Sequence, residues 1–305
     1  MKNLNIKSIF PQSLRLTFIL STLLIAMQAN AQANVMPGDR VRYHDFKNDT
    51  LRITEILTTV LQNDPGTPGA RIETIGRLFL DTPYVAHTLE VDSGMPEIIT
   101  VNIDELDCTT FVETVAAMAK TVGEGRSSWR DFVYNLENLR YRRGEMTDYG
   151  SRLHYIADWI VDNTYRGNVK DATPSFPKVN YTTKSLNFMS SNRDKYTALS
   201  DSTQYQRILN IENGYRNHRY PFIKTVDLNS KATKAAFQSG DMVALTSNLK
   251  NLDVTHLGII VVKDGEPYLM HASSSLGKVT ITTVPLAEFM QRNRNLTGVR
   301  VFRLL

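Results

Sequence analysis

The spacing of apolar residues changes character near residue 240. Before it, apolar residues recur at helical spacing over residues 49–63, 71–80, 128–139 and 151–163, and in a segment that begins at 107 or 108. After it, short β-branched stretches at residues 242–246, 255–262, 267–273, 278–283 and 299–304 have the composition of strands. Spacings of three to four indicate amphipathic helices, and short β-branched runs between turns indicate strands. Helices followed by antiparallel strands predict an α+β domain.

Two stretches carry weak periodic signals. Residues 81–103 are interrupted by Pro83, Gly94 and Pro96 and are expected to be irregular. Residues 168–220 are polar, and we expect loops around short helices there. No internal repeat or long low-complexity linker divides the chain, so residues 32–305 are expected to form one domain with a helical insertion around 125–235.

The first 31 residues have the composition of a secretory signal peptide. Lys2, Lys7 and Arg15 form a basic region, an apolar run covers residues 16–27, and Ala29-Asn30-Ala31 is a small-x-small cleavage site. Cleavage before Gln32 is expected, which predicts a periplasmic or secreted protein. The alternative, an anchor helix, requires about 20 apolar residues, and this run is too short for it.

Composition narrows the function classes. The formal net charge of +4 includes the three cations of the signal peptide, so the mature chain carries about +1. No run of Lys or Arg and no nucleic-acid-binding motif occurs, so nucleic acid is not an expected partner. A monomer without a stable membrane anchor is expected.

The chain has a single cysteine, Cys108, and therefore no internal disulfide. Asp107 precedes it as a good N-cap, so Cys108 is expected in the first turn of a helix. Free backbone N–H groups and the helix dipole favour a thiolate there and lower its pKa. The same N–H groups could bind an oxyanion. The alternative is that Asp107 is only a cap and Cys108 only a small buried side chain.

Two of the six histidines fall in one predicted hairpin. Asp264-Gly265 is a typical two-residue turn, and pairing about it places His271 opposite Gly258 and diagonal to His256. Alternation then puts both imidazoles on one face, within reach of each other. A thiol nucleophile needs a base and a group that orients the base. We therefore expect Cys108, His256 and His271 to form a catalytic triad.

A metal site is a weaker interpretation of the two histidines. No HExxH motif occurs, and neither histidine has an acidic neighbour at metal-ligand spacing. No metal or organic cofactor is therefore expected.

Several motifs together resemble a known family. Residues 107–111 (DCTTF), 255–261 (THLGIIV) and 269–274 (LMHASS) resemble the Cys, His and His motifs of NlpC-type papain-like cell-wall hydrolases. Residues 240–243 (GDMV) resemble the start of the first core strand of that family, and residues 80–84 (LDTPY) resemble its Pro-Tyr segment. The resemblance implies a papain-like core, a cysteine mechanism, and a site role for the hydroxyl of Tyr84.

The finer resemblance is to the N-acetylmuramoyl-L-alanine amidase-like branch, formerly a domain of unknown function. It rests on residues 82–90 (TPYVAHTLE), 106–113 (LDCTTFVE) and 151–160 (SRLHYIADWI). Three features depart from the wider family: His87 replaces a usual Gly, 24 positions separate Tyr84 from Cys108, and the insertion after Cys108 is long. These departures concern substrate placement rather than the Cys–His pair.

Residues 149–155 are the candidate recognition segment. Arg152 could pair with a stem-peptide carboxylate, Tyr149 or Tyr155 could stack on a sugar, and Ser151 and Asp107 are expected to contact substrate as well. The alternative is an ordinary helix start in which Ser151 is the cap and Arg152 is solvated.

The resemblance implies hydrolysis of the amide between N-acetylmuramic acid and L-Ala in small muropeptides, including anhydro forms. Cys108 would attack the lactyl carbonyl, and His256 would protonate the leaving nitrogen and then activate water. One alternative is a D-Glu–diamino acid endopeptidase with the same triad. Another is a non-enzymatic cell-wall-fragment binder, and a third is a thiol redox sensor, although the chain has no resolving cysteine.

Overall fold

The computed structural model describes residues 40–305, so the expected signal peptide at residues 1–31 lies outside the described residues. The helices are α1 Phe46–Gln62, α2 Pro68–Leu78, α3 Cys108–Gly123, α4 Trp129–Arg140, α5 Ile156–Tyr165, α6 Phe188–Ser191, α7 Ser202–Gly214, α8 Lys231–Ala236 and α9 Leu286–Gln291. The strands are β1 Val41–Tyr43, β2 Ile99–Val101, β3 Val169–Asp171, β4 Val179–Lys184, β5 His218–Lys224, β6 Met242–Ser247, β7 Val254–Lys263, β8 Glu266–Ser273, β9 Lys278–Ile281 and β10 Leu296–Leu304.

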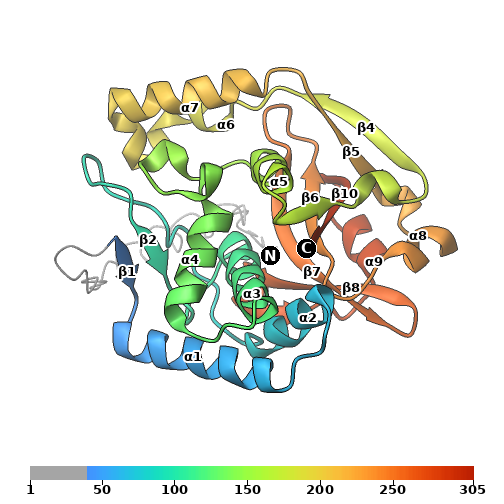
Figure 1. The fold of residues 1–305 in the computed structure, drawn as a ribbon. Coiled ribbons are helices and arrows are strands. Elements are labelled where there is room, and N and C mark those ends of the chain that lie inside the picture. Colours follow the sequence, from blue (N-terminus) through green and yellow to red (C-terminus); the bar gives the residue numbers. More distant parts are fainter. Residues whose placement is uncertain (1–39) are drawn as a thin grey trace, which may run out of the picture.

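The expected mixture of early helices and a late sheet is confirmed. The main sheet has the order β4-β5-β10-β6-β7-β8-β9, and β3 also pairs with β10. Its strand pairs are antiparallel, whereas β1 and β2 form a separate parallel pair. Figure 1 shows the helices α1, α3 and α4 together on one side of this sheet. The arrangement fits the α+β class.

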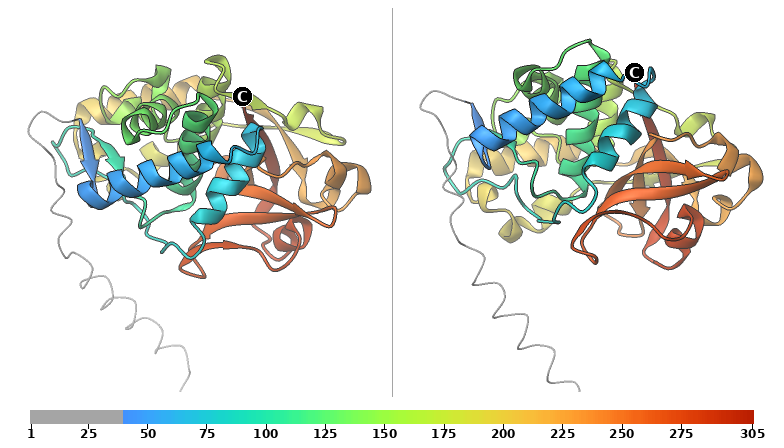
Figure 2. Two further views of the ribbon diagram at one scale, coloured as in Figure 1. Left: turned by 60° about the horizontal axis from the view of Figure 1, so that its bottom comes forward. Right: turned by 90° about the horizontal axis from the view of Figure 1, so that it is seen from below.

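Helix α3 lies at the centre of the largest apolar core. Twelve of its side chains are buried, and the helix is partly open only in its first turn and at Lys120 and Gly123 near its end. Its neighbours in the core are α1, α2, α4 and one face of β7 and β8, as the two further views also show (Figure 2). The opposite face of the sheet packs against α9 in a second core. The sheet is therefore covered on both faces, and α3 is held rigidly against one of them.

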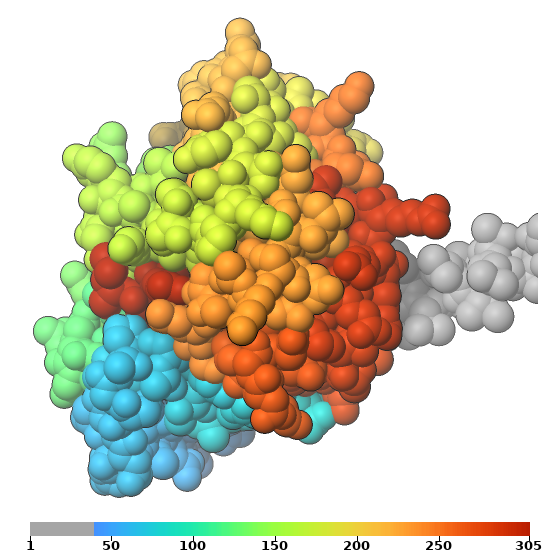
Figure 3. Space-filling model, turned by 90° about the vertical axis from the view of Figure 1, so that its right-hand side faces the viewer, coloured from blue at the N-terminus to red at the C-terminus, as the bar shows by residue number. Residues whose placement is uncertain are grey.

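The segment after α5 contains the expected short helices, such as α6, but it is more regular than its composition suggested. It contains β3, β4, β5 and the 13-residue helix α7. Strand β4 pairs with β5 over six residues, from Val179↔Ile223 to Lys184↔His218. Because β4 is an edge strand, its two faces carry Asn, Thr and Lys, and alternation of hydrophobic residues is lost. Figure 3 shows β4 at the surface above α8.

Helix α5 begins five residues later than expected. Ser151 lies in a 3-10 turn, Tyr149–Ser151, that Asp148 caps through a hydrogen bond from the Ser151 N–H. The helix itself starts at Ile156 without a side-chain cap of its own. The Asp253 carboxylate, from the start of β7, accepts the N–H of Ala157 at 2.8 Å and supplies the missing acceptor.

Among residues 40–305, no helix combines the length and hydropathy needed to cross a membrane.

Candidate active site

The first turn of α3 carries Cys108, as the N-cap pattern predicted. Asp107 caps the helix: its Oδ1 accepts the N–H of Thr109 at 3.0 Å and of Thr110 at 2.8 Å. The Thr110 hydroxyl in turn accepts the N–H of Asp107 at 2.8 Å, which completes a capping box. The side chain of Cys108 is partly exposed, whereas most of the helix behind it is buried.

This cap changes the electrostatics that the sequence suggested. The N–H groups of Thr109 and Thr110 are occupied by Asp107 and cannot bind an oxyanion or a thiolate. Burial and the neighbouring charge of Asp107 raise the pKa of the Cys108 thiol to about 11. The prediction of a lowered thiol pKa is therefore wrong for the free protein, because desolvation and a capping carboxylate outweigh the helix dipole.

The hairpin has the predicted register. Ile259 pairs with Met270 and Lys263 with Glu266, so the turn is centred on Asp264-Gly265. Both turn residues have positive φ, 53° and 78°, as a tight primed hairpin turn requires. His256 Nε2 lies 2.7 Å from His271 Nδ1, with the rings at 88°. The prediction that the two imidazoles share a face and bond to each other is confirmed.

A bulge not visible in the sequence shapes the start of β7. Leu245 pairs with His256 but Thr246 pairs with Val254, so Thr255 is an extra residue in the strand. Such a bulge bends and twists the strand locally and redirects the next side chain. That side chain is His256, so the bulge sets the direction of the imidazole.

Gly258 lies against β8 rather than between the two imidazoles. A Cβ at this position would lie 2.5 Å from Leu269 Cδ1 and 2.9 Å from the Met270 carbonyl oxygen. Its closest neighbours are thus the β8 side chain and main chain, not the two imidazoles. The glycine permits the close approach of β8 rather than a gap between the rings.

The Cys108 thiol approaches β7 next to Leu257, the residue that follows His256. The backbone N–H of Leu257 lies near the Cys108 sulfur and partly offsets the rise in thiol pKa that burial causes. Leu257 belongs to the core shared with α3, whereas Ile260 and Leu269 belong to the α9 side, where Phe289 contacts His271 at 5.5 Å between ring centroids. The hydrogen bonds of the described residues do not include one between Cys108 and His256, whose Nδ1 is left without a partner.

Both imidazoles are neutral in this environment. Burial, with the charge of His271 adding to it, lowers the pKa of His256 to about 3. Burial also lowers the pKa of His271 to about 4. Together with the raised pKa of Cys108, these values give a resting state of thiol and neutral imidazole rather than thiolate and imidazolium.

Tyr84 is brought to the first turn of α3, as expected. Its main chain bridges to Leu106, two residues before Cys108, and its N–H donates to the Gly277 carbonyl at 2.8 Å. Burial raises the pKa of the Tyr84 hydroxyl, and the nearby groups of Cys108 and Asp107 raise it further. The phenol therefore stays protonated near neutral pH and remains a hydrogen-bond donor.

His87, which stands where a glycine is usual in the wider family, has a backbone that favours glycine. Its φ is 65°, in the left-handed region, and its carbonyl accepts the N–H of Glu90 at 3.1 Å. A glycine would adopt this conformation at no steric cost, whereas histidine adopts it with some strain. The imidazole of His87 is exposed.

A cavity of about 520 Å³ opens over the two histidines. Its walls come from the β6–β7 loop, the start of β7, the end of β8, α9 and the start of β10. Apart from the histidines the lining carries no charged side chain and is rich in hydroxyl and amide groups: Ser247, Asn248, Thr255, Ser273, Ser274, Ser275, Asn293 and Asn295. The cavity suits a polar, uncharged group.

The candidate recognition segment is turned inward instead. Arg152 is 5% exposed and lies 3.3 Å from Glu97 and 3.7 Å from Glu90, with a hydrogen bond to the Leu89 carbonyl at 2.9 Å. It also stacks on the ring of Tyr149, 4.9 Å away. Arg152 thus has carboxylate partners within the protein, and the expected pairing with a substrate carboxylate has no support in this geometry.

The other residues of that segment are also engaged internally. Tyr149 is 2% exposed, and its hydroxyl reaches Glu90 at 3.4 Å. The Tyr155 hydroxyl donates to Glu212 at 2.7 Å. Ser151 Oγ donates to the Asp148 carbonyl at 2.6 Å. Neither aromatic ring is available for stacking on a sugar in this conformation, and Asp107 is engaged as the helix cap.

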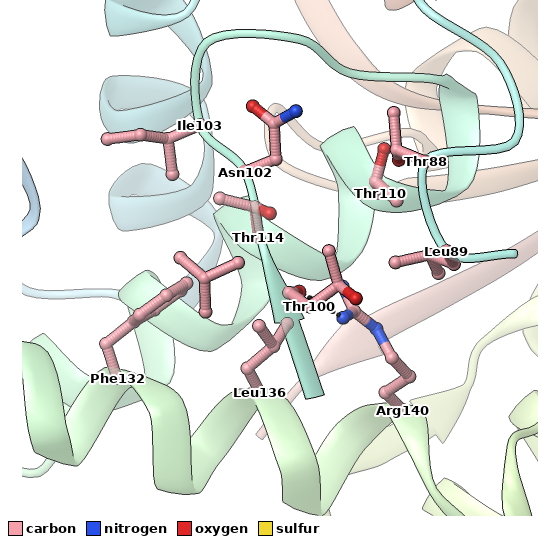
Figure 4. A pocket seen from close by; sticks show the side chains of 11 residues that line it. Thr88, Leu89, Thr100, Asn102, Ile103, Thr110, Thr114, Phe132, Leu136 and Arg140 are labelled. Carbon is pink, nitrogen blue, oxygen red and sulfur yellow. Dashed lines mark hydrogen bonds between the residues drawn. The ribbon is translucent and has the colours of Figure 1, made fainter. Parts of the chain in front are cut away.

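A buried ion pair supports α3 from behind. Arg140 Nε donates to Glu113 Oε2 at 2.6 Å, and Arg140 also donates to the Thr100 carbonyl at 2.7 Å. Figure 4 shows Arg140 reaching from α4 toward Thr100, with Thr110 and Thr114 projecting from α3 around the same small cavity. That cavity, about 10 Å³, is large enough for one water molecule and not for a substrate.

Within residues 40–305, no group of three or more His, Cys, Asp or Glu side chains is arranged to hold a metal ion. The histidine pair is bonded to itself, with Phe289 as its other aromatic neighbour.

Comparisons with solved structures agree with this fold. An N-acetylmuramoyl-L-alanine amidase from Bacteroides uniformis is 36% identical, with a TM-score of 0.74, over 79% of this chain and 100% of that one. A Bacteroides fragilis protein named as a candidate xylanase is also 36% identical, with a TM-score of 0.70, over 75% of this chain and 98% of that one. The Legionella pneumophila protein LPG0564, at 21% identity and a TM-score of 0.66, covers 85% of this chain and 96% of that one, and shares the fold.

A comparison with curated proteins finds no match. The family model described as AmiA-like, N-acetylmuramoyl-L-alanine amidase-like, matches residues 74–299, which include Tyr84, Cys108, His256 and His271. The chain therefore belongs to the N-acetylmuramoyl-L-alanine amidase-like family.

Proposed function

We propose that this protein is an exported cysteine amidase with a papain-like core that hydrolyses the amide between N-acetylmuramic acid and L-Ala in small muropeptides. The single observation that carries the proposal is the 2.7 Å bond between His256 Nε2 and His271 Nδ1, in the hairpin whose Leu257 N–H lies near the Cys108 sulfur. A cysteine hydrolase site combines a thiol, an imidazole base and a group that orients the base, and Cys108, His256 and His271 can supply these three.

The chemistry follows from which nitrogen is free. His256 Nε2 is engaged by His271, so Nδ1 is the nitrogen that accepts the thiol proton. Because the resting pair is neutral, proton transfer accompanies attack of the sulfur on the lactyl carbonyl. The imidazolium then gives its proton to the departing L-Ala nitrogen, and neutral His256 activates the water that hydrolyses the thioester.

The oxyanion needs two donors, and the helix supplies fewer than expected. With the N–H groups of Thr109 and Thr110 engaged by Asp107, the backbone N–H of Cys108 is the donor that remains in the first turn. The Tyr84 hydroxyl, protonated and near Cys108, is suited to donate the second hydrogen bond.

The neutral cavity over the histidines suits the sugar half of such a substrate. Its hydroxyl and amide side chains can pair with sugar hydroxyl and acetamido groups, whereas stem peptides carry carboxylates that would find no cation there. The same lining contains no Asp or Glu, so it lacks the carboxylate pair that a glycoside hydrolase such as a xylanase uses.

Product analysis tests the proposal. The mature protein is incubated with a defined anhydro-muropeptide, and the products are identified by mass spectrometry. Release of an intact stem peptide with a free L-Ala amino group, together with the peptide-free sugar, is expected. Cleavage after D-Glu instead would identify the endopeptidase, and an unchanged substrate bound without turnover would identify a binding protein.

A further inference from the structure

The β6–β7 loop, residues 248–253, forms one wall of the cavity over the histidines and leads into β7. Ser247, Asn248 and Leu249 line that cavity. Four residues after Leu252 the chain reaches His256. The position of this loop therefore affects both the shape of the cavity and the entry of the strand that carries the base.

A single side chain from the segment between α3 and β6 binds the main chain of this loop. Lys184, the last residue of β4, donates to three backbone carbonyls: Ser247 at 2.5 Å, Leu249 at 2.6 Å and Leu252 at 2.8 Å. An ammonium group has three donors and no acceptor, so these three bonds use its full capacity. Bonds from a charged donor are stronger than neutral ones.

Other contacts also tie the β6–β7 loop to the segment between α3 and β6. The Asn251 carbonyl accepts the N–H of Asn187, and Leu252 packs against the apolar cluster formed around α6 and α7. Within the loop, Ser247 N–H donates to the Asp253 carbonyl, and Asn248 N–H donates to Asn295. Three carbonyl dipoles converge on one point, and they repel one another unless a cation lies between them.

We propose that Lys184 is a positioning residue for the active site, which holds the β6–β7 loop as a wall of the substrate cavity by binding three of its carbonyl groups. The proposal rests on the proposed function, since the cavity matters only if it holds substrate. Its consequence is that substrate binding depends on Lys184, a residue at the β4 edge of the main sheet. This residue does not itself contact the reacting atoms.

Lys184→Met tests the role of the charge, because methionine keeps much of the aliphatic stem and removes the donors. KM for the muropeptide is expected to rise about tenfold while kcat changes less than threefold, since His256 is still held by its pairing with β6. Hydrogen exchange should quicken in residues 248–253 and not in β8. Lys250→Met, a change to an exposed lysine of the same loop that does not line the cavity, is the control and should leave both readouts unchanged.

Chemical rescue separates the clamp from a general loss of packing. Lys184→Ala should show the same rise in KM, and added methylammonium should lower it again, whereas methanol at equal concentration should not. A KM within twofold of the unmodified protein for Lys184→Met, or an equal rise in the Lys250→Met control, would overturn the proposal.

A measurement on the unmodified protein covers the case in which the variants do not fold. Amine labelling under native conditions should modify Lys250 rapidly and Lys184 slowly, because all three donors of Lys184 are engaged. Equal labelling rates would overturn the clamp. If the wild type shows no turnover of muropeptides, the proposed function fails, and the labelling and exchange results still decide whether the clamp exists.

Discussion

His256 Nε2 and His271 Nδ1 lie 2.7 Å apart with their rings nearly perpendicular. Only one proton can occupy such a bond. If His256 Nδ1 is to accept a proton from Cys108, Nε2 must carry the hydrogen and His271 Nδ1 must accept it. His271 thus fixes the tautomer of His256 and continues to accept the same hydrogen bond after His256 becomes charged.

This relationship predicts an order among substitutions at the two positions. His271→Asn and His271→Gln keep an acceptor and should retain more activity than His271→Ala, which we expect to lower kcat by orders of magnitude with little change in KM. His256→Gln should be as inactive as His256→Ala, because neither side chain shuttles a proton near neutral pH. Steady-state kinetics on one muropeptide measures both series. Equal activity of His271→Ala and His271→Asn would remove the orienting role.

Cys108→Ala and Cys108→Ser should both abolish hydrolysis while leaving the fold intact. The alcohol of serine is a poorer nucleophile than the thiol, and no base near it is strong enough to compensate. Turnover is followed by mass spectrometry, and circular dichroism with thermal unfolding monitors the fold. Substantial turnover by either variant would exclude the cysteine mechanism.

The thiol of the free protein should react slowly with alkylating agents near neutral pH. Burial and the charge of Asp107 raise the pKa of Cys108 to about 11, so the reactive thiolate is scarce below pH 8. Because Cys108 is the only cysteine, intact mass reports its alkylation by iodoacetamide as a function of pH. Asp107→Asn keeps a capping oxygen and removes the charge, so its profile should shift to lower pH. A midpoint below pH 7 in the wild type would contradict the neutral resting pair.

Acid should destabilise the folded protein through the histidine pair. The pKa values of His256 and His271 are lowered to about 3 and about 4, below the usual 6.5. Between pH 6.5 and pH 4 the unfolded state binds more protons than the folded state. The free energy of unfolding is therefore highest above about pH 6.5, as far as these two groups decide it, and it falls as the pH falls toward 4. The slope is at most about 1.4 kcal/mol per pH unit for each proton. Urea unfolding from pH 7 to pH 4 measures it, and a His256→Gln/His271→Gln double variant should show a flatter dependence.

The hairpin was predictable because its register depends on local sequence. Asp264-Gly265 fixes the turn, and alternation from a fixed turn puts His256 and His271 on one face without knowledge of the rest of the fold. The start of α3 was predictable for the same reason, since Asp107 is a strong cap directly before an apolar stripe. Both features are set within one short stretch of the chain.

Other features depend on contacts between distant segments. The raised pKa of Cys108 comes from desolvation by the surrounding chain and from the charge of Asp107, and a helix start does not reveal the first of these. Its charge and its place in a family motif make Arg152 a candidate ligand contact in the sequence. In the structure its guanidinium group pairs with the carboxylate of Glu97, 55 positions earlier in the chain. The bulge at Thr255 and the strands β3 to β5 have no local signal, because pairing with distant strands forms them.

The buried pair of Glu113 and Arg140 should be the most sensitive charged contact to truncation. Both side chains are at most 4% exposed, and the 2.6 Å bond joins α3, which carries Cys108, to α4. Removing one partner leaves a buried charge without compensation, so Glu113→Ala should lower the free energy of unfolding by about 3–5 kcal/mol. Glu73 and Arg77 make an ion pair of similar length, 2.7 Å, on the surface of α2. Glu73→Ala should cost about 0.5 kcal/mol or less, because solvent screens that pair. Urea unfolding of both variants measures the difference.

Glu113→Gln keeps a hydrogen-bond acceptor for Arg140 without the charge, so its free energy of unfolding should fall between those of Glu113→Ala and the wild type. Equal costs for Glu113→Ala and Glu73→Ala would mean that water or a shift of α4 compensates Arg140, and that α3 does not depend on this pair.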